Sequence, residues 1–185
     1  MPVGAPSRFP LSAVRGVRLG VARAGIRKPD RRDLVVLELA PGSRVAARFT
    51  RNAFCAAPVT LAREHLAASP GAIRYLLVNT GNANAGTGPR GMQDARECCR
   101  ELARLGGVAE QAVLPFSTGV IGEPLPVERV VGGMAEALAA LAGDAWEAAA
   151  EGIMTTDTRP KGASRRVRIG TAEVTVSGIA KGAGM

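Results

Sequence analysis

An apolar run of strand length at residues 73–78 (IRYLLV) passes directly into a loop rich in asparagine and glycine at residues 79–86 (NTGNANAG). A mostly apolar run of this length is typical of a buried strand. Asparagine and glycine tolerate positive φ, and asparagine side chains can lock a turn from within. The loop is therefore either an internally bonded turn or a segment that shapes a site at the end of the strand.

The rest of the chain continues this alternation of short β-rich runs and helical segments. Two β-rich runs at 33–40 and 44–50 flank Pro41-Gly42-Ser43, which favours a hairpin. Without a repeat, a linker or a low-complexity tract, residues 1–185 are expected to form a single α/β domain, or most of one. Helices are predicted at 58–68, 92–105, 126–141 and 144–151, another strand at 112–116, and a second hairpin at 166–169 and 174–179 around Gly170.

The single histidine and three cysteines restrict the chemistry. One histidine cannot make a two-histidine zinc site, and no CxxC spacing occurs, so no metal site is expected. His65 is predicted to lie on an exposed helical turn without a catalytic role. Cys98 and Cys99 are adjacent in a helical pattern, where neighbouring side chains diverge, which favours one packed thiol and one half-exposed thiol over a disulfide. Free cysteines indicate a reducing, cytoplasmic location.

The net charge of +8 is concentrated at one end, because residues 1–60 hold 11 basic and 3 acidic residues. Few aromatic residues accompany this charge, whereas nucleic-acid binders usually combine the two. A solvated basic face and a subunit interface are both compatible with it, and a basic nucleic-acid-binding module remains an alternative. No run of 18 apolar residues occurs, so no membrane association is expected. The first residues also lack the pattern of a secretory signal.

Residues 86–91 (GTGPRG) fit the GxGxxG pattern of dinucleotide-binding folds. In such folds the first glycine follows the strand directly, whereas here the apolar strand ends near Asn79. Pro89 also removes a backbone donor from the loop. We therefore do not expect a nucleotide site, although a nucleotide-binding domain remains a further alternative.

Three other clusters carry groups suited to polar ligands. Thr118 and Gly119 belong to STGVIG at 117–122, where a hydroxyl and exposed backbone N–H groups could hold a developing oxyanion. Residues 155–158 (TTDT) offer hydroxyls and one carboxylate, either for ligand recognition or as an ordinary turn. Lys181 lies among small residues near the C-terminus, where it could approach an anion or simply be exposed.

Taken together, these motifs resemble the ornithine acetyltransferase (glutamate N-acetyltransferase) family. NTGNANAGTG, STGVIG, GIMTTDTRPKGAS and GIAKGAGM occur in the order and spacing of that family, and FTRNAFCAAPV at 49–59 also looks like it. The resemblance covers about residues 16–185, and the chain looks like the N-terminal, or α, chain of such an enzyme. Related self-cleaving hydrolases resembling aminopeptidases match these motifs less well.

The resemblance implies a mechanism that this chain cannot perform alone. Family members are precursors that cut themselves before a threonine, which becomes the N-terminal nucleophile of a β chain and uses its own amine as base. That threonine carries an acetyl group from N2-acetylornithine to glutamate in arginine biosynthesis. The cleavage segment would follow Met185, and neither Thr155 nor Thr156 can replace the nucleophile, since neither has a free amine.

The resemblance also implies the fold, the partners and the site residues. We expect a layered α-β-β-α-like sandwich of the self-cleaving N-terminal-nucleophile type, completed by the β chain, in an α2β2 heterotetramer. Thr118 and Gly119 match the family's oxyanion hole, and Thr158 and Lys181 match its substrate-binding residues. No cofactor is expected, but acetyl-CoA is a second candidate acetyl donor.

Overall fold

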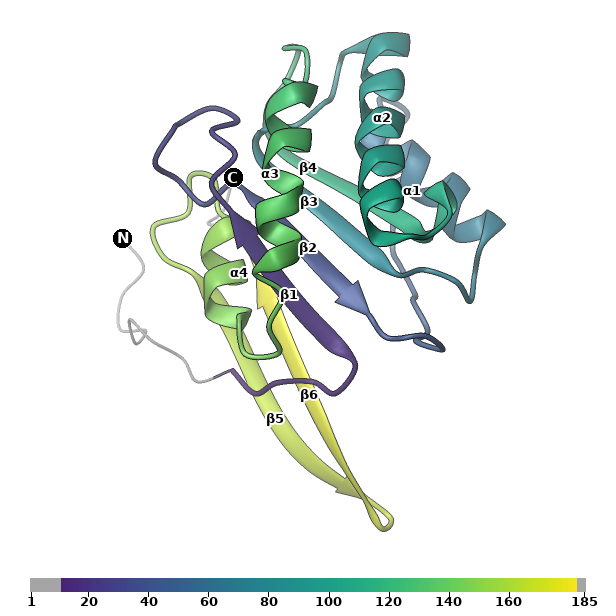
Figure 1. Ribbon diagram of the computed structural model, residues 1–185, viewed down its shortest axis with the longest axis vertical. Coiled ribbons are helices and arrows are strands. Elements are labelled where there is room, and N and C mark those ends of the chain that lie inside the picture. Colours follow the sequence, from purple (N-terminus) through teal and green to yellow (C-terminus); the bar gives the residue numbers. More distant parts are fainter. Residues whose placement is uncertain (1–10, 183–185) are drawn as a thin grey trace.

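The computed structural model describes residues 11–182, and its centre is a four-stranded sheet in the order β1-β2-β3-β4 (Figure 1). Strands β1, β2 and β3 are antiparallel neighbours, whereas β3 and β4 are parallel. The strands are β1 Val17–Ala22, β2 Leu34–Leu39, β3 Tyr75–Asn82, β4 Val113–Val120, β5 Lys161–Ile169 and β6 Ala172–Ala180. The helices are α1 Ala57–Ala68, α2 Gly88–Gly106, α3 Val127–Ala139 and α4 Trp146–Gly152, with a 3-10 turn at Glu110–Ala112.

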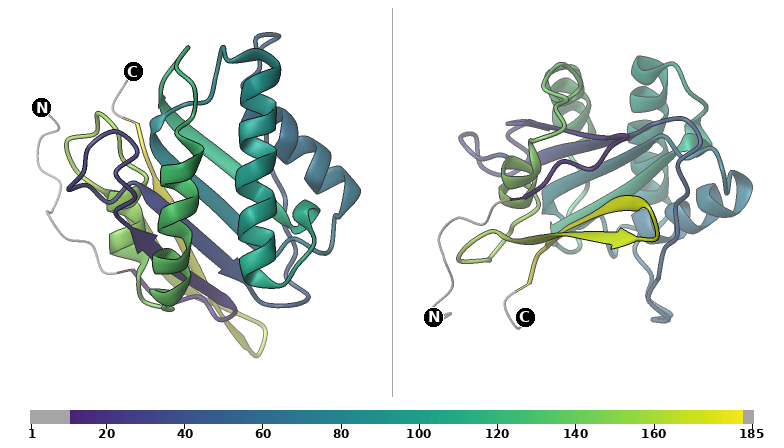
Figure 2. Two further views of the ribbon diagram at one scale, coloured as in Figure 1. Left: turned by 45° about the horizontal axis from the view of Figure 1, so that its top comes forward. Right: turned by 90° about the horizontal axis from the view of Figure 1, so that it is seen from below.

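The elements form layers on both faces of this sheet (Figure 2). Helices α2 and α3 cover one face, and α1 packs beside β4 and α2. The antiparallel hairpin of β5 and β6 crosses the other face together with α4. In the described part of the chain the hairpin is a separate two-stranded sheet, so its two outer edges are unpaired.

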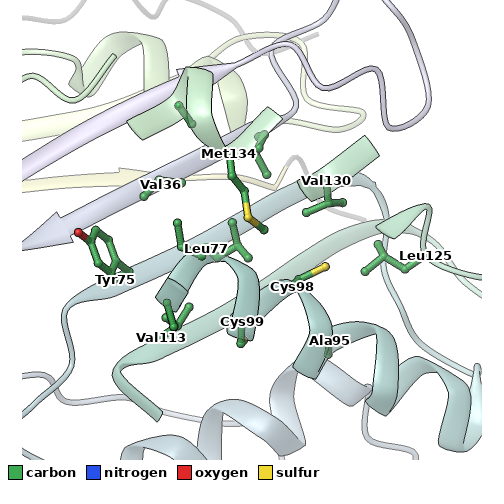
Figure 3. Close-up of a cluster of buried hydrophobic side chains, with 14 of the residues drawn as sticks. Val36, Tyr75, Leu77, Ala95, Cys98, Cys99, Val113, Leu125, Val130 and Met134 are labelled. Carbon is green, nitrogen blue, oxygen red and sulfur yellow. The ribbon is translucent and has the colours of Figure 1, made fainter. Parts of the chain in front are cut away.

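The main core lies between the sheet and helices α2 and α3 (Figure 3). Side chains alternate between the two faces of a strand, so Val36 and Leu77 point into this core while Val35 packs with Trp146 on the opposite face. Helix α2 presents a stripe of small and apolar residues to the same core and ends at Gly106; the next residue, Gly107, caps it with a φ of 65° that suits glycine. The face under α2 and α3 is therefore buried, whereas on the hairpin side Leu76 and Val78 are partly buried and Phe116 is 42% exposed.

Most of the predicted elements are confirmed, with shifted ends. Helix α2 begins four residues earlier than expected because Pro89 occupies its first turn, where proline is tolerated. Strand β4 runs to Val120, so Thr118 and Gly119 belong to the strand rather than to a loop after it. The C-terminal hairpin is also confirmed and is longer than predicted.

The first predicted hairpin is wrong. Residues 44–50 form no strand, because both edges of β2 are occupied by β1 and β3. Strand β1 escaped prediction because Gly20 interrupts its apolar pattern. The structure requires a glycine there, since a Cβ on Gly20 would lie 1.8 Å from the carbonyl oxygen of Ala137 in α3.

Two predictions about single side chains are also wrong. His65 is 2% exposed rather than on an exposed turn, and its Nδ1 lies 2.7 Å from the carbonyl oxygen of Val113. Cys98 and Cys99 are both buried, because α2 is covered by the sheet on one side and by α1 and α3 on the others. Both thiols are free, as expected. The N-terminal stretch tested for a secretory signal lies outside the described residues, and within residues 11–182 no helix is long and apolar enough to cross a bilayer.

Candidate functional site

The ammonium group of Lys181 meets the hydroxyl of Thr118 at one end of the sheet. Thr118 is two residues before the end of β4, and Lys181 directly follows β6. The Nζ of Lys181 donates a hydrogen bond to Oγ1 of Thr118 at 2.7 Å. A contact between residues 63 positions apart thus joins two of the motifs that the sequence singled out.

This pair borders a cavity of about 660 Å³, which we call the cationic cavity. Its walls come from the ends of β3 and β4, the loop between β1 and β2, and the turn after α4. Four cations line it against one carboxylate. Arg27 is paired with Glu123 at 2.8 Å, but the remaining positive charge still favours an anionic ligand. The lining residues are Arg27, Lys28, Arg31, Asp33, Thr80, Gly81, Thr118, Gly119, Val120, Ile121, Thr155, Thr156 and Lys181.

Gly119 occupies a backbone position that no other residue would accept without strain. Its φ is +144°, and a Cβ there would lie 2.3 Å from the carbonyl carbon of Gly81. The register between β3 and β4 shifts at this point, with Asn82 facing both Thr118 and Val120. Irregularities of this kind are common beside functional sites, where they redirect backbone groups.

The segment rich in asparagine at 79–86, whose first four residues belong to β3 rather than to a loop, combines both roles considered for it. Asn79 donates to the carbonyl oxygen of Asn82 at 2.9 Å and accepts from the hydroxyl of Ser117 at 2.5 Å. Asn82 binds the carbonyl oxygens of Glu123 and Pro124, and Asn84 binds that of Gly91. These buried amides brace the loop from within. The same loop begins with residues that line the cationic cavity, so a braced segment also shapes the site.

The loop that carries the basic residues is held by Asp33. Its two carboxylate oxygens accept hydrogen bonds from the backbone N–H groups of Ala24 and Ile26, at 2.7 and 2.6 Å. Burial raises the pKa of Asp33, and these hydrogen bonds only partly offset that effect. Asp33 thus shapes the loop, and its single carboxylate offsets at most one of the four cations that line the cavity.

The four residues 155–158 do not act as one cluster. Thr155 and Thr156 line the cationic cavity, whereas Thr158 lines a neighbouring cavity of about 740 Å³ that shares only Arg31 and Thr155 with the first. The structure therefore brings Thr118, Gly119 and Lys181 together but places Thr158 in the adjoining cavity. The carboxylate of Asp157 is occupied within the protein, as expected for a turn.

Three cationic residues of the site, Arg27, Lys28 and Arg31, were not predicted as site residues. The sequence signal was present, because residues 23–32 hold five of the basic residues of the N-terminal segment against one acidic residue, Asp30. Arg31 also donates to the carbonyl oxygens of Met154 and Thr155, which fixes the turn after α4 to the basic loop. The charge was attributed to a solvated or subunit face because sequence order alone does not show which loops meet.

In the GxGxxG segment, Gly91 lets the start of α2 pack closely against the preceding loop. A Cβ on Gly91 would lie 1.8 Å from Oγ1 of Thr87 and 2.4 Å from Oδ1 of Asn84. Helix α2 begins at Gly88, six residues beyond the end of β3 at Asn82. Within residues 11–182 no group of three or more His, Cys, Asp or Glu side chains is arranged to hold a metal ion.

Fold and site together define a mixed α/β protein with a cationic small-ligand cavity at the strand ends. Residues 18–185 match the ArgJ family, and the chain belongs to that family. It is 56% identical over its whole length to the arginine biosynthesis bifunctional protein ArgJ of Pseudomonas syringae pv. tomato, of which it covers 45%. It is 57% identical over 175 residues to the protein of the same name from Methylococcus capsulatus, covering 95% of this chain and 42% of that protein. The chain thus spans less than half the length of these relatives.

Solved structures agree with this assignment. The arginine biosynthesis bifunctional protein ArgJ of Bacillus halodurans superposes with a TM-score of 0.83 at 32% identity, covering 94% of this chain and 92% of that one. The ornithine acetyltransferase of Mycobacterium tuberculosis, solved in complex with ornithine, superposes with a TM-score of 0.81 at 33% identity. The match covers 94% of this chain and 91% of that one. These matches give no support to a nucleic-acid-binding module.

Proposed function

We propose that this chain is the α part of a self-processed acetyltransferase that moves an acetyl group from N2-acetylornithine to glutamate. The acetyl group would pass through a threonine at the N-terminus of a second, β chain. The observation that carries the proposal is the contact between Lys181 and Thr118 beside Gly119 in a cationic cavity. Both substrates bear carboxylates, which such a cavity attracts.

Thr118 and Gly119 would stabilise the oxyanion that forms when the threonine attacks the acetyl group. A hydroxyl that accepts a hydrogen bond from an ammonium becomes a better donor, since consecutive hydrogen bonds polarise one another. The contact from Lys181 leaves the proton of Thr118 free to point at the oxyanion. Gly119 would add its backbone N–H, and its position at the register shift of the β3–β4 ladder supports this role.

The substrate would be held by residues of both adjoining cavities. Lys181 is suited to a substrate carboxylate, because no carboxylate of residues 11–182 forms an ion pair with it. Thr158 would contact the substrate where the second cavity meets the first, with Thr155 and Arg31 between them. No cofactor enters this scheme, and acetyl-CoA is a second donor to be tested through release of free CoA.

The β chain would complete the fold as well as the site. The relatives are more than twice as long as this chain, whereas the matched chain of each solved structure is of similar length, which supports a polypeptide cut into two parts. The two-stranded sheet of β5 and β6 offers unpaired edges, and its Val167, Ile169 and Val176 are 43 to 65% exposed. Strands of the β chain would extend this sheet into the second layer of an N-terminal-nucleophile sandwich, in an α2β2 heterotetramer.

The experiment that tests the proposed activity replaces Thr118 in the full-length protein and follows acetyl transfer from N2-acetylornithine to glutamate. Thr118→Ala should lower kcat by about 10²-fold or more, as expected for the loss of one oxyanion donor. Thr118→Ser keeps the hydroxyl and should retain most of the activity. Equal rates for the wild type and the alanine variant would refute the role of Thr118, and a wild type without transfer would refute the proposed function.

A further inference from the structure

Asp157 has a buried carboxylate in an otherwise exposed turn. Its neighbours Thr156 and Thr158 are exposed, but the side chain of Asp157 is only 1% exposed. Its Oδ1 accepts from Nζ of Lys161 at 2.7 Å and from the backbone N–H of Gly182 at 2.6 Å, and its Oδ2 accepts from the N–H of Thr155 at 3.3 Å. A buried carboxylate is retained where several donors compensate its desolvation.

The three donors belong to three different segments of the chain. Thr155 lines the cationic cavity, Lys161 begins β5, and Gly182 follows the end of β6. Lys161 is paired with Ala180 in the β5–β6 register. Asp157 therefore closes the open end of the hairpin and ties it to the rim of the cavity.

Lys181 lies between the end of β6 and Gly182, next to the hydrogen bond that Asp157 accepts. The residue after it, Gly182, has a φ of +125°, a conformation that few residues other than glycine adopt, and its N–H is held by Asp157. The lysine side chain has four flexible bonds, so the place of its ammonium depends on how firmly its backbone is held. With the backbone fixed at Gly182, Nζ of Lys181 reaches Oγ1 of Thr118 at 2.7 Å.

The same carboxylate also separates the roles of the two lysines. Asp157 forms an ion pair with Lys161, whereas Lys181 has no such pair among the described residues. An ammonium already paired with a carboxylate has less to offer a ligand. By holding Lys161, Asp157 leaves the charge of Lys181 available to the cavity.

We propose that Asp157 is a positioning residue, which acts through the backbone of Gly182 to hold Lys181 against Thr118 in the cationic cavity. Asp157 also lines the second cavity beside Thr158, but its oxygens already accept hydrogen bonds from the protein, so we expect its effect on activity to pass through Lys181. The functional half of this inference rests on the proposed acetyl transfer, whereas its structural half concerns the amide of Gly182 alone.

The structural half is tested by amide hydrogen exchange, measured on the full-length protein in whatever processed form it naturally adopts. In Asp157→Ala the N–H of Gly182 loses its acceptor and should exchange at least about tenfold faster than in the wild type. The N–H of Ile26, which Asp33 holds in the same way, is the internal control and should not change. Unchanged exchange at Gly182, or faster exchange at both amides, would overturn the proposal. If the alanine variant does not fold, Asp157→Asn replaces it, because asparagine keeps the shape and one oxygen acceptor. In that variant the exchange rate should rise by a smaller factor, and only at Gly182.

The functional half is tested by a double-mutant cycle on acetyl transfer with Asp157→Ala, Lys181→Ala and the double variant. If Asp157 acts through Lys181, its replacement should lower kcat/KM by about tenfold in the wild type but by less than about twofold where Lys181 is already alanine. Additive losses would show that Asp157 has a separate, merely structural role and would overturn the proposal. If Lys181→Ala itself has no effect, the role assigned to Lys181 and with it the functional half of the inference are wrong. A wild type without acetyl transfer would refute the proposed function instead, and the exchange of Gly182 still decides the structural half.

Discussion

The Nζ of Lys181 donates a hydrogen bond to Oγ1 of Thr118, near the end of β4, at 2.7 Å. Among the described residues, this ammonium group has no carboxylate partner. A pair of this kind can bind an anion and polarise a donor at the same time.

Replacing Lys181 should impair binding and catalysis but not folding. The side chain is exposed, and its one hydrogen bond to Thr118 contributes little to stability. We expect Lys181→Ala to lower kcat/KM for acetyl transfer by on the order of 10- to 100-fold, as for the loss of a hydrogen bond to a charged group. Steady-state kinetics on the processed full-length protein measures this, and wild-type kcat and KM for both substrates would show that the assigned role is wrong.

Replacing Gly119 should destabilise the fold. Alanine at this position would have a strained φ of +144° and a Cβ 2.3 Å from the backbone of Gly81. We expect Gly119→Ala to lower the free energy of unfolding by about 2 kcal/mol or more. Gly132 in α3 is the matched control, since a Cβ there meets nothing within 4 Å, and Gly132→Ala should stabilise the helix by about 0.5–1 kcal/mol. Similar unfolding curves for the two variants would contradict the geometry.

The stability of the protein at acid pH should depend on Asp157. Burial raises its pKa, but the hydrogen bonds from Lys161, Gly182 and Thr155 outweigh this and lower the pKa to about 2, from 3.8. A carboxyl whose folded-state pKa is lowered stabilises the protein above its unfolded pKa, and this contribution disappears as pH falls through the folded value. The difference in unfolding free energy between the wild type and Asp157→Asn should therefore narrow by roughly 2 kcal/mol from pH 5 to pH 2.

The comparison with the variant is essential in that measurement. The pKa of Asp33 is raised by burial, so its contribution has the opposite sign and is lost as pH rises above the unfolded value. Denaturant titrations of both proteins across this range cancel the common effect of Asp33. A difference that stays constant with pH would show that Asp157 titrates normally and that its hydrogen bonds are absent in solution.

The three cysteines should differ sharply in reactivity. Burial raises the pKa of Cys98 to about 12 and raises that of Cys99 further, whereas Cys55 is partly exposed. Since the thiolate is the reactive form, a thiol reagent should modify Cys55 in the native protein and reach the other two only after unfolding. Peptide mapping by mass spectrometry distinguishes the three sites. Rapid native modification of Cys98 would mean that α2 is not packed on the sheet.

Local patterns predicted most of the elements but not how they meet. The helices and the C-terminal hairpin follow from periodicity and from glycine and proline at their ends, and they are confirmed. Strand pairing was missed where it depends on segments that are distant in sequence. The pattern of β1 does not indicate a strand by itself; its pairing with β2 and the close approach of α3 at Gly20 explain why it is one. His65 was misplaced for the same reason, since its burial comes from β4, almost 50 residues later.

The site was predictable as motifs rather than as an assembly. Family motifs identified Thr118, Gly119 and Lys181, which the structure brings together. Arg27 and Lys28 lie in no such motif, and they line the cavity because their loop, held by Asp33, folds back over the ends of the strands. Charge density along a sequence therefore indicates a site only when the loop geometry is also known.

The central claim is that this chain works with a second chain whose terminal threonine carries the acetyl group. The direct measurement is intact mass and N-terminal sequencing of the full-length protein, before and after incubation with N2-acetylornithine and without glutamate. We expect two chains, the second beginning with threonine, and a gain of one acetyl group on that second chain only. A single uncut polypeptide, or an acetyl group attached to the chain described here, would contradict the account.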